Sequence, residues 1–181
     1  MKKLIIFISA AVFVSSCHKD LDGVPPTGKQ NALSGVQRDS IPDSACLKIR
    51  IQKDSAMIDE TAVAFFHSAT STYNPQLDSK YFPGFGIASL ATLTSDGVPC
   101  ASQCIPFTLT NSVRLRVGST ESNNYILKLS YLYKFPSGIH IWLKDMFLSD
   151  SVDLRSKSYA FTVNKPDTST FGSDRFKVFV R

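Results

Sequence analysis

The chain has 181 residues and a formal net charge of +5, and 43% of its residues are hydrophobic against 19% charged. These values are typical of a globular protein rather than a disordered one, and the length suits one folded domain. The small positive charge argues against the extended basic face that nucleic-acid-binding proteins carry, so we expect no nucleic-acid partner.

The first 17 residues have the organisation of a bacterial leader. Lys2 and Lys3 precede an apolar run over residues 4–14, which is shorter than the roughly 20 residues that a membrane-spanning helix needs. The residues Val14-Ser15-Ser16-Cys17 then resemble a lipobox, in which the cysteine is acylated. We expect a signal peptide over 1–17 and a mature chain anchored to a membrane by lipid on Cys17. An ordinary secretory signal with a chance cysteine is the alternative.

Residues 18–45 are rich in Gly, Pro, Ser and Asp and contain few large apolar side chains. The run Pro25-Pro26-Thr27-Gly28 blocks any regular element. Such a stretch buries too little apolar area to offset its ordering entropy. It is predicted to be a flexible linker between the anchor and a folded domain over residues 46–181.

The folded part is dominated by apolar residues at every second position, which places one face of a strand in a core and the other in water. Six segments follow this rule: Leu47, Ile49 and Ile51; Val113, Leu115 and Val117; Tyr125, Leu127, Leu129 and Tyr131; Ile139, Ile141 and Leu143; Tyr159, Phe161 and Val163; and Phe176, Val178 and Val180. Further strands are expected at 61–66, 87–94 and 100–105. The pattern predicts an all-β, antiparallel sandwich of about nine strands.

Three cysteines lie in the predicted domain. Cys100 and Cys104 are four residues apart on one strand, hence about 13 Å apart and beyond disulfide reach. A disulfide from Cys46 to Cys100 or Cys104 is one prediction, and three buried thiols that behave as small apolar residues are the other.

No pattern identifies a catalytic site or a cofactor. His67 and His140 are isolated in the sequence, and no serine lies in a Gly-x-Ser-x-Gly turn. Asp59-Glu60 has the residue type for Ca²⁺ but lacks the companion ligands, so solvation in a turn is the expected role. We therefore predict no catalytic residue, no metal site and no cofactor.

One outward-facing set remains. If Ile139, Ile141 and Leu143 point inward, then His140, Trp142 and Lys144 point outward and the only tryptophan is exposed. Other strands carry basic residues on their polar faces, namely Arg114, Arg116, Lys128, Arg175 and Lys177. Exposed aromatic rings stack on sugars and cations pair with acidic groups. Trp142, His140, Lys144, Arg114 and Arg116 are thus candidate ligand-binding residues for a polysaccharide. A solvated face that prevents edge pairing is the alternative.

Several short motifs in a fixed order resemble one known module. They are Asp59-Glu60-Thr61, Ala69-Thr70, Ser95-Asp96-Gly97, Ile105-Pro106, Tyr125-Ile126-Leu127, 139–145 (IHIWLKD), Asp153-Leu154, Tyr159-Ala160-Phe161 and Asp174-Arg175-Phe176. Together they resemble the immunoglobulin-like β-sandwich that precedes the C-terminal sorting domain in cell-surface and adhesin-like proteins of bacteria with type IX secretion. The resemblance covers about 47–180 and implies extracellular display without established catalysis. No sorting domain follows Arg181, so membrane attachment is expected to come from lipid.

The same bacterial group attaches O-glycans at Asp-Ser/Thr-apolar tripeptides. Asp39-Ser40-Ile41 and Asp43-Ser44-Ala45 match this pattern in the linker, so Ser40 and Ser44 are candidate acceptors.

These observations predict a lipid-anchored protein of the outer membrane or cell surface, without enzymatic activity. Its expected partners are the membrane and either a polysaccharide or another envelope protein, and it is expected to be a monomer. A purely structural remnant of a larger secreted protein is the alternative. A hydrolase with an unrecognised site is a third reading.

Overall fold

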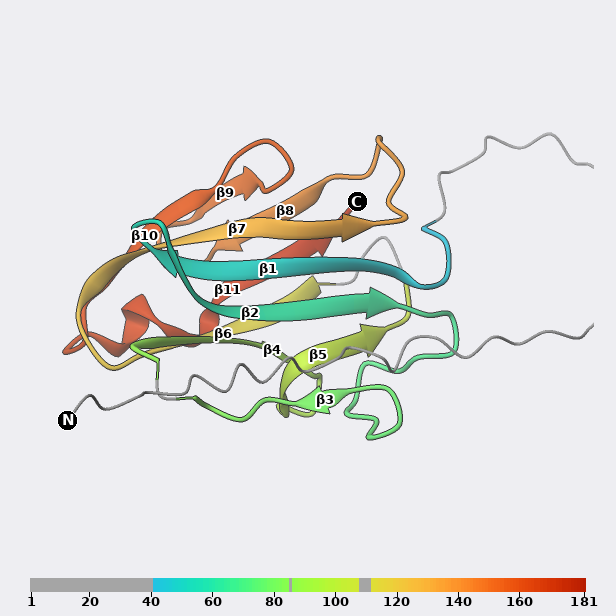
Figure 1. The fold of residues 1–181 in the computed structure, drawn as a ribbon, viewed down its shortest axis with the longest axis horizontal. Coiled ribbons are helices and arrows are strands. Elements are labelled where there is room, and N and C mark those ends of the chain that lie inside the picture. The colour runs from blue at the N-terminus through green and yellow to red at the C-terminus, as the bar shows by residue number, and fades with distance from the viewer. Residues whose placement is uncertain (1–40, 85, 108–111) are drawn as a thin grey trace, which may run out of the picture. The chain divides into compact units, whose positions relative to one another are not determined.

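The computed structural model describes residues 41–84, 86–107 and 112–181, which form an all-β domain (Figure 1). The strands are β1 (Ala45–Lys53), β2 (Ala56–Phe65), β3 (Ser79–Lys80), β4 (Ala88–Leu93), β5 (Pro99–Ile105), β6 (Ser112–Ser119), β7 (Asn123–Tyr133), β8 (Ile141–Asp145), β9 (Asp150–Asp153), β10 (Tyr159–Val163) and β11 (Gly172–Val180). A short 3₁₀ turn, η1 (Thr168–Thr170), precedes β11. The all-β prediction is confirmed, with eleven strands instead of about nine. The two additional strands, β3 and β9, are short and carry no run of alternating apolar residues.

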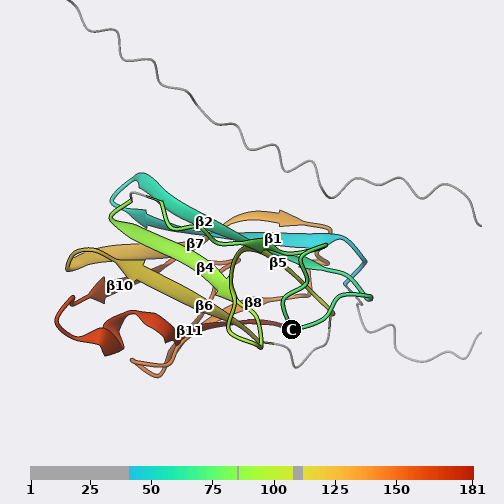
Figure 2. The ribbon, with the colours of Figure 1, turned by 90° about the horizontal axis from the view of Figure 1, so that it is seen from below.

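All strands belong to one sheet, in the order β10-β7-β1-β2-β5-β4-β6-β11-β8-β9 with β3 paired to β5. The sheet curls into a nearly barrel-shaped form, and Figure 2 shows β1 and β2 on one side of the domain and β6 and β11 on the other. Hydrogen bonds thus join the strands into one sheet, not the two sheets that a sandwich contains. The sheet is also not purely antiparallel, because β2 and β5 run parallel from the pair Ala62 and Ser102 to the pair Phe65 and Ile105.

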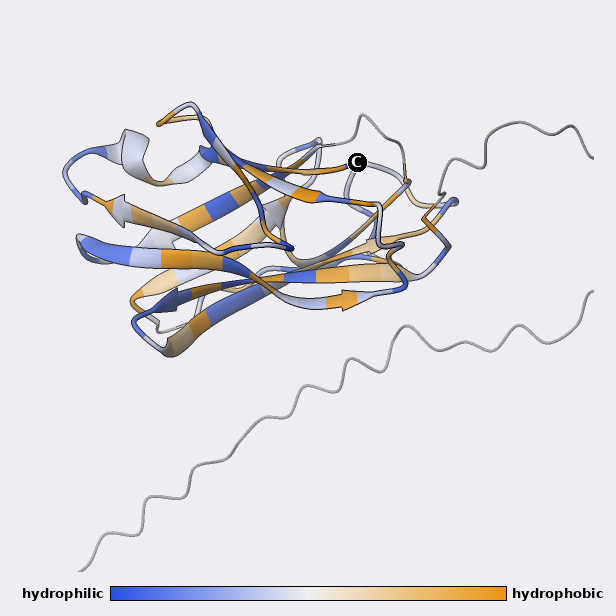
Figure 3. Cartoon of the chain, turned by 90° about the horizontal axis from the view of Figure 1, so that it is seen from above, coloured by the Kyte–Doolittle hydropathy of each residue, from blue (hydrophilic) through white to orange (hydrophobic). Residues whose placement is uncertain are grey.

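The core lies inside the curled sheet and is filled by the alternating residues. In β1, Leu47, Ile49 and Ile51 are at most 1% exposed, and Leu115 and Val178 are equally buried on the opposite wall. Figure 3 shows the same alternation as hydrophobic and hydrophilic bands along the strands. Each such side chain stabilises the fold by about 1.5–3 kcal/mol through removal from water. The period-two pattern therefore accounts for which face of each strand points inward.

The pattern fails at the end of β7, where Tyr131 was expected inside and is 47% exposed. The cause is a β-bulge: Lys48 pairs with Tyr131 and Ile49 with Leu129, which leaves Ser130 as an extra residue. The extra residue reverses the phase, so Tyr131 and Tyr133 both face outward with their rings stacked at 6.4 Å. Ser130 stays in place because its hydroxyl donates to Lys48 O.

The folded domain begins earlier than residue 46. Ile41 is 1% exposed and belongs to the core, and the Ser44 N–H donates to Phe65 O at 2.8 Å. Residues 41–45 are therefore part of the domain, not of the linker predicted over 18–45. A single isoleucine among Asp, Ser and Pro leaves no periodic signal, which is why the sequence did not reveal it.

Strand register separates the cysteines that were predicted to form a disulfide. Cys46 is opposite Ala64 on β2, and Ala64 is opposite Cys104 on β5. Two strand spacings of about 4.8 Å then lie between the Cα atoms of Cys46 and Cys104, roughly 9.6 Å and beyond the disulfide range. Cys100 is farther along β5, and burial raises the pKa of its thiol to about 11, with the negative charge of Asp78 adding to the effect. The predicted disulfides are thus incompatible with the register.

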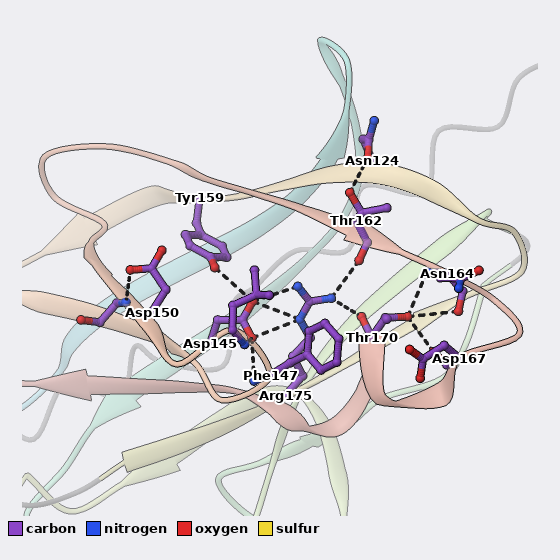
Figure 4. Close-up of polar contacts among 12 residues, drawn as sticks. Asn124, Asp145, Phe147, Asp150, Tyr159, Thr162, Asn164, Asp167, Thr170 and Arg175 are labelled. Carbon is purple, nitrogen blue, oxygen red and sulfur yellow. Dashed lines mark hydrogen bonds and ion pairs between the residues drawn. The ribbon is translucent and has the colours of Figure 1, made fainter.

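The two ends of the sheet, β10 and the β8–β9 pair, meet around a buried ion pair (Figure 4). Arg175 Nη2 lies 2.8 Å from Asp145 Oδ2, and these side chains are 2% and 0% exposed. The guanidinium also donates to Thr162 O on β10 and to Thr170 O in η1. One side chain from β11 therefore links β8 to β10, which no backbone hydrogen bond joins among the described residues. This corrects the prediction that Arg175 lies on a polar face: an irregular register between Gly172 and Phe176 turns it inward.

Neighbouring groups complete the desolvation of this ion pair. The guanidinium carbon of Arg175 lies 4.8–5.2 Å from the ring centres of Phe147, Phe161 and Phe176. The Tyr159 hydroxyl donates to Asp145 at 3.1 Å. Burial raises the pKa of Tyr159 to about 12, and the adjacent charge of Asp145 adds to the rise. We call this cluster the clasp, because its contacts join strands β8, β10 and β11.

We predict that Arg175→Met lowers the free energy of unfolding by about 3–5 kcal/mol, because it leaves the Asp145 carboxylate buried without a counter-charge. Urea denaturation followed by circular dichroism measures the change. The matched control, Arg116→Met at an exposed position of β6, should change stability by less than about 0.5 kcal/mol. Equal effects of the two substitutions would show that the clasp does not hold the sheet ends together.

Candidate functional site

The outer face of β6, β11 and β8 carries two parallel rows of side chains. In the first, the basic row, Lys177 on β11 is directly opposite Arg114 on β6 and Lys144 on β8. In the second, the aromatic row, Phe179 on β11 is opposite Trp142 on β8. The rows form because the inward residues Val178 and Leu143 lie between them along each strand and fix the phase. We call these two rows together the cationic face.

The basic row is not neutralised by the protein. None of the ion pairs that the described residues form includes Arg114, Lys144 or Lys177. Arg114 Nη2 donates to Thr94 O at 2.9 Å, which fixes the guanidinium and leaves its other N–H groups available. Neighbouring strands are about 4.8 Å apart, so the Cα atoms of these three residues span about 10 Å. Such a row attracts an anionic ligand with regularly spaced charges.

The aromatic row lies beside it. Trp142 points outward as the alternation predicted, but its side chain is half-buried rather than exposed. Its ring is covered in part by the guanidinium of Arg181, at 5.7 Å from the ring centre, and by the His140 ring at 6.3 Å. These two side chains fix the position of the indole, and the part of the ring that stays exposed suits stacking against a ligand ring.

His140 is held in place by Asp153 on β9. The His140 Nδ1 and Asp153 Oδ2 atoms are 2.6 Å apart. Burial alone would raise the pKa of Asp153, but the hydrogen bonds from His140 and from the Arg155 and Ile141 N–H groups outweigh it and lower the pKa. Asp153 is therefore a carboxylate at neutral pH, and it forms the acidic border of the cationic face.

The structure brings four of the five predicted binding residues together on or beside the cationic face, namely Arg114, Lys144, Trp142 and His140. The fifth, Arg116, lies at the edge of that face. Arg116 is exposed on the same face of β6, but its partner across the strands is Ala91 on β4. The sequence missed Phe179 and Arg181, although Phe179 lies between the inward Val178 and Val180 and could have been assigned to the outer face from that alternation.

A cavity of about 340 Å³ opens at one end of the basic row. Its lining includes Gln103 from β5, Ser112 and Arg114 from β6 and Lys177 from β11. Gln103 is 3% exposed, and its amide Oε1 is one of two buried side-chain polar atoms without a hydrogen-bond partner among the described residues. We call this cavity the slot. Nothing in the sequence distinguished Gln103 from an ordinary strand residue.

The remaining predicted positions are Ser44, Ser40 and Cys17. Ser44 is part of the folded domain, where its hydroxyl accepts a hydrogen bond from Lys134 Nζ at 3.1 Å, and Cys17 and Ser40 lie outside the described residues. Within residues 41–84, 86–107 and 112–181, no group of three or more His, Cys, Asp or Glu side chains could hold a metal ion. That part of the chain also holds no helix of the length and apolarity that crossing a membrane requires.

Comparison with known proteins gives one match. Residues 38–179 match the model of a family described as a domain of unknown function (DUF8693). No curated protein and no solved structure matches the chain.

We predict that Lys177→Gln raises the free energy of unfolding by about 0.2–1 kcal/mol at low salt, because like charges directly opposite each other across strands destabilise a sheet. The gain should disappear near 1 M salt, where the screening length is about 3 Å. Urea denaturation at both salt concentrations measures it. Lys177→Arg keeps the charge and should give no gain; a gain from both substitutions would disprove repulsion as the cause.

Proposed function

This chain belongs to the DUF8693 family, a family of unknown function, and we propose that it is a non-catalytic, monomeric module that binds acidic polysaccharide. The observation that carries the proposal is the cationic face: three unpaired cations in register beside a half-buried tryptophan. Cations in register pair with the carboxylates of an acidic glycan, and the Trp142 ring stacks on the apolar face of a sugar.

The composition of the face favours a glycan over the other anionic polymers. Its cations occupy one short row at the border of an aromatic patch, whereas a nucleic-acid site needs a longer basic stripe or a recognisable binding motif. The outer surface of neighbouring strands suits an extended chain that lies across them. Binding at such a surface needs no catalytic group, which agrees with the absence of a nucleophile motif in the sequence.

We also propose that the domain is displayed from the outer membrane or cell surface by lipid on Cys17. The support is the lipobox-like sequence at 14–17 and the polar linker that follows it. O-glycans on Ser40 and Ser44 fit the same location.

The immunoglobulin-like module that precedes type IX sorting domains remains the proposed relative, with the single curled sheet as a variant of its sandwich. Two of its motifs support this: Ser95-Asp96-Gly97 forms the turn between β4 and β5, with Gly97 at φ 83°, and β5 ends at Ile105 before Pro106.

We predict that the mature chain binds polygalacturonate and that Trp142→Ala weakens binding about twofold to tenfold, since loss of ring stacking costs about 0.5–1.5 kcal/mol. Lys144→Gln should weaken binding less, and salt should reduce all affinities because the cations are solvent-accessible. Affinity gel electrophoresis with the immobilised polymer measures the effect.

Lys128→Gln is the matched control, because it removes one charge from the outer face of β7, where Lys128 is opposite Arg50 on β1 and not opposite a residue of the basic row. It should leave polygalacturonate binding unchanged. Neutral galactan should not retard the protein. Equal retardation by galactan, or equal losses from Lys128→Gln and Lys144→Gln, would refute an acidic-glycan site on the cationic face.

For the anchor, we predict that Cys17→Ala moves the protein from the membrane pellet to the soluble fraction, because the acyl chains that hold it are no longer attached. Fractionation of cells that express either form, with immunoblotting, measures the shift. Ser16→Ala keeps the cysteine and should remain in the pellet. A Cys17→Ala variant that still sediments with membranes contradicts lipid attachment at this residue.

A further inference from the structure

The slot lies at the ends of three strands. β4 pairs with β5 over only two residue pairs, Thr92 with Cys100 and Leu93 with Pro99. β5 continues to Ile105, and β6 begins at Ser112 (Figure 1). Residues near the end of β4, the end of β5 and the start of β6 line the slot. Inward-facing residues such as Ile105 and outward-facing residues such as Arg114 both line it.

Gln103 is a buried residue in the lining of the slot. A buried amide oxygen without a partner destabilises a protein, because it has given up its water and gained no donor. An apolar residue of the same size would fit the same position without that cost. An unsatisfied acceptor in the wall of a polar cavity is thus explained if a ligand donates to it.

The mouth of the slot supplies the complementary groups. Lys177 and Arg114, two residues of the basic row, also line the slot. Ser71, Ser95 and Ser112 line it as well. A ligand that fits must therefore offer a negative charge toward the mouth and hydroxyl groups toward the interior.

We propose that the slot binds a single terminal hexuronic acid residue of an acidic glycan, whose chain continues along the basic row. A sugar hydroxyl donates to Gln103 Oε1, and the carboxylate accepts from Lys177 and Arg114. The volume of about 340 Å³ lies at the lower end of the range for small-molecule sites, which suits one sugar ring. This inference rests on the proposed function. It adds that the glycan binds in one orientation, because only a terminal sugar of the chain enters the slot.

The test is titration of the mature, isotopically labelled chain with free galacturonate, followed by NMR. We expect saturable shifts, and at least tenfold weaker binding of galactose, which lacks the carboxylate. Gln103→Leu should weaken galacturonate binding about fivefold or more, while its melting temperature stays equal to or above that of the parent, because the unsatisfied oxygen is gone. Lys177→Gln should also weaken binding, and Lys128→Gln should not.

The outcomes separate the slot from the cationic face as a whole. Galacturonate binding that is unchanged in Gln103→Leu overturns the slot inference, as does a loss that accompanies a lower melting temperature in that variant. If polygalacturonate binds and Trp142→Ala weakens it, but free galacturonate does not bind, then the slot inference fails and the proposed function stands. If galacturonate binds through Gln103 and the polymer does not bind, the proposed function fails and the slot remains a monosaccharide site.

Discussion

The fold depends on closing a sheet whose end strands do not pair with each other. The clasp of Arg175 on Asp145 and on the backbone of β10 performs this closure from inside. It uses β8 and β11, the same two strands that present the cationic face. Asp145 directly follows Lys144 on β8, and Arg175 lies two residues before Lys177 on β11. The same two strands therefore carry the buried ion pair on the inside of the sheet and two cations of the basic row on the outside. Because the interior contact holds these strands in register, the exterior cations keep a fixed spacing.

Charged side chains are arranged differently on two regions of the sheet's outer surface. On β1 and β2, Lys48 and Arg50 both lie within 3.4 Å of Glu60, which also accepts from the Ser130 hydroxyl. Burial alone would raise the pKa of Glu60, but these partners outweigh it and lower the pKa, so the charges compensate one another. On β6, β11 and β8 no carboxylate lies opposite the basic row. The net charge of +5 conceals this contrast, because attraction of an anion is set by local arrangement.

Alternation of apolar residues was sufficient to predict six of the strands and the outward position of Trp142, His140 and Lys144, because burial of one face depends on local sequence. It failed where the register of a strand is irregular. Ser130 in β7 and the irregular step before Phe176 in β11 exposed Tyr131 and buried Arg175. The joining of all strands into one sheet and the parallel pairing of β2 with β5 depend on contacts between distant segments. The slot could not be predicted for the same reason, because residues from β5, β6 and β11 line it together. Gln103 is distinguished from other strand residues only by its place in that lining.

Two features that lower the stability of the domain, adjacent like charges and an unpaired buried oxygen, lie on the cationic face and in the adjoining slot. Lys177 is held between two like charges, and the slot contains a buried amide oxygen without a donor. Arg50 Nε, the second such atom among the described residues, belongs instead to the compensated network around Glu60. Elsewhere buried polar groups such as Asp78 and Asp145 have several partners. A fold that satisfies its buried polar groups in most places, but keeps like charges side by side along one face and a buried acceptor unpaired in the adjoining cavity, is expected when a ligand completes these groups. The ligand that completes this set must carry anionic groups, hydroxyls and an apolar ring face, and an acidic sugar chain has all three.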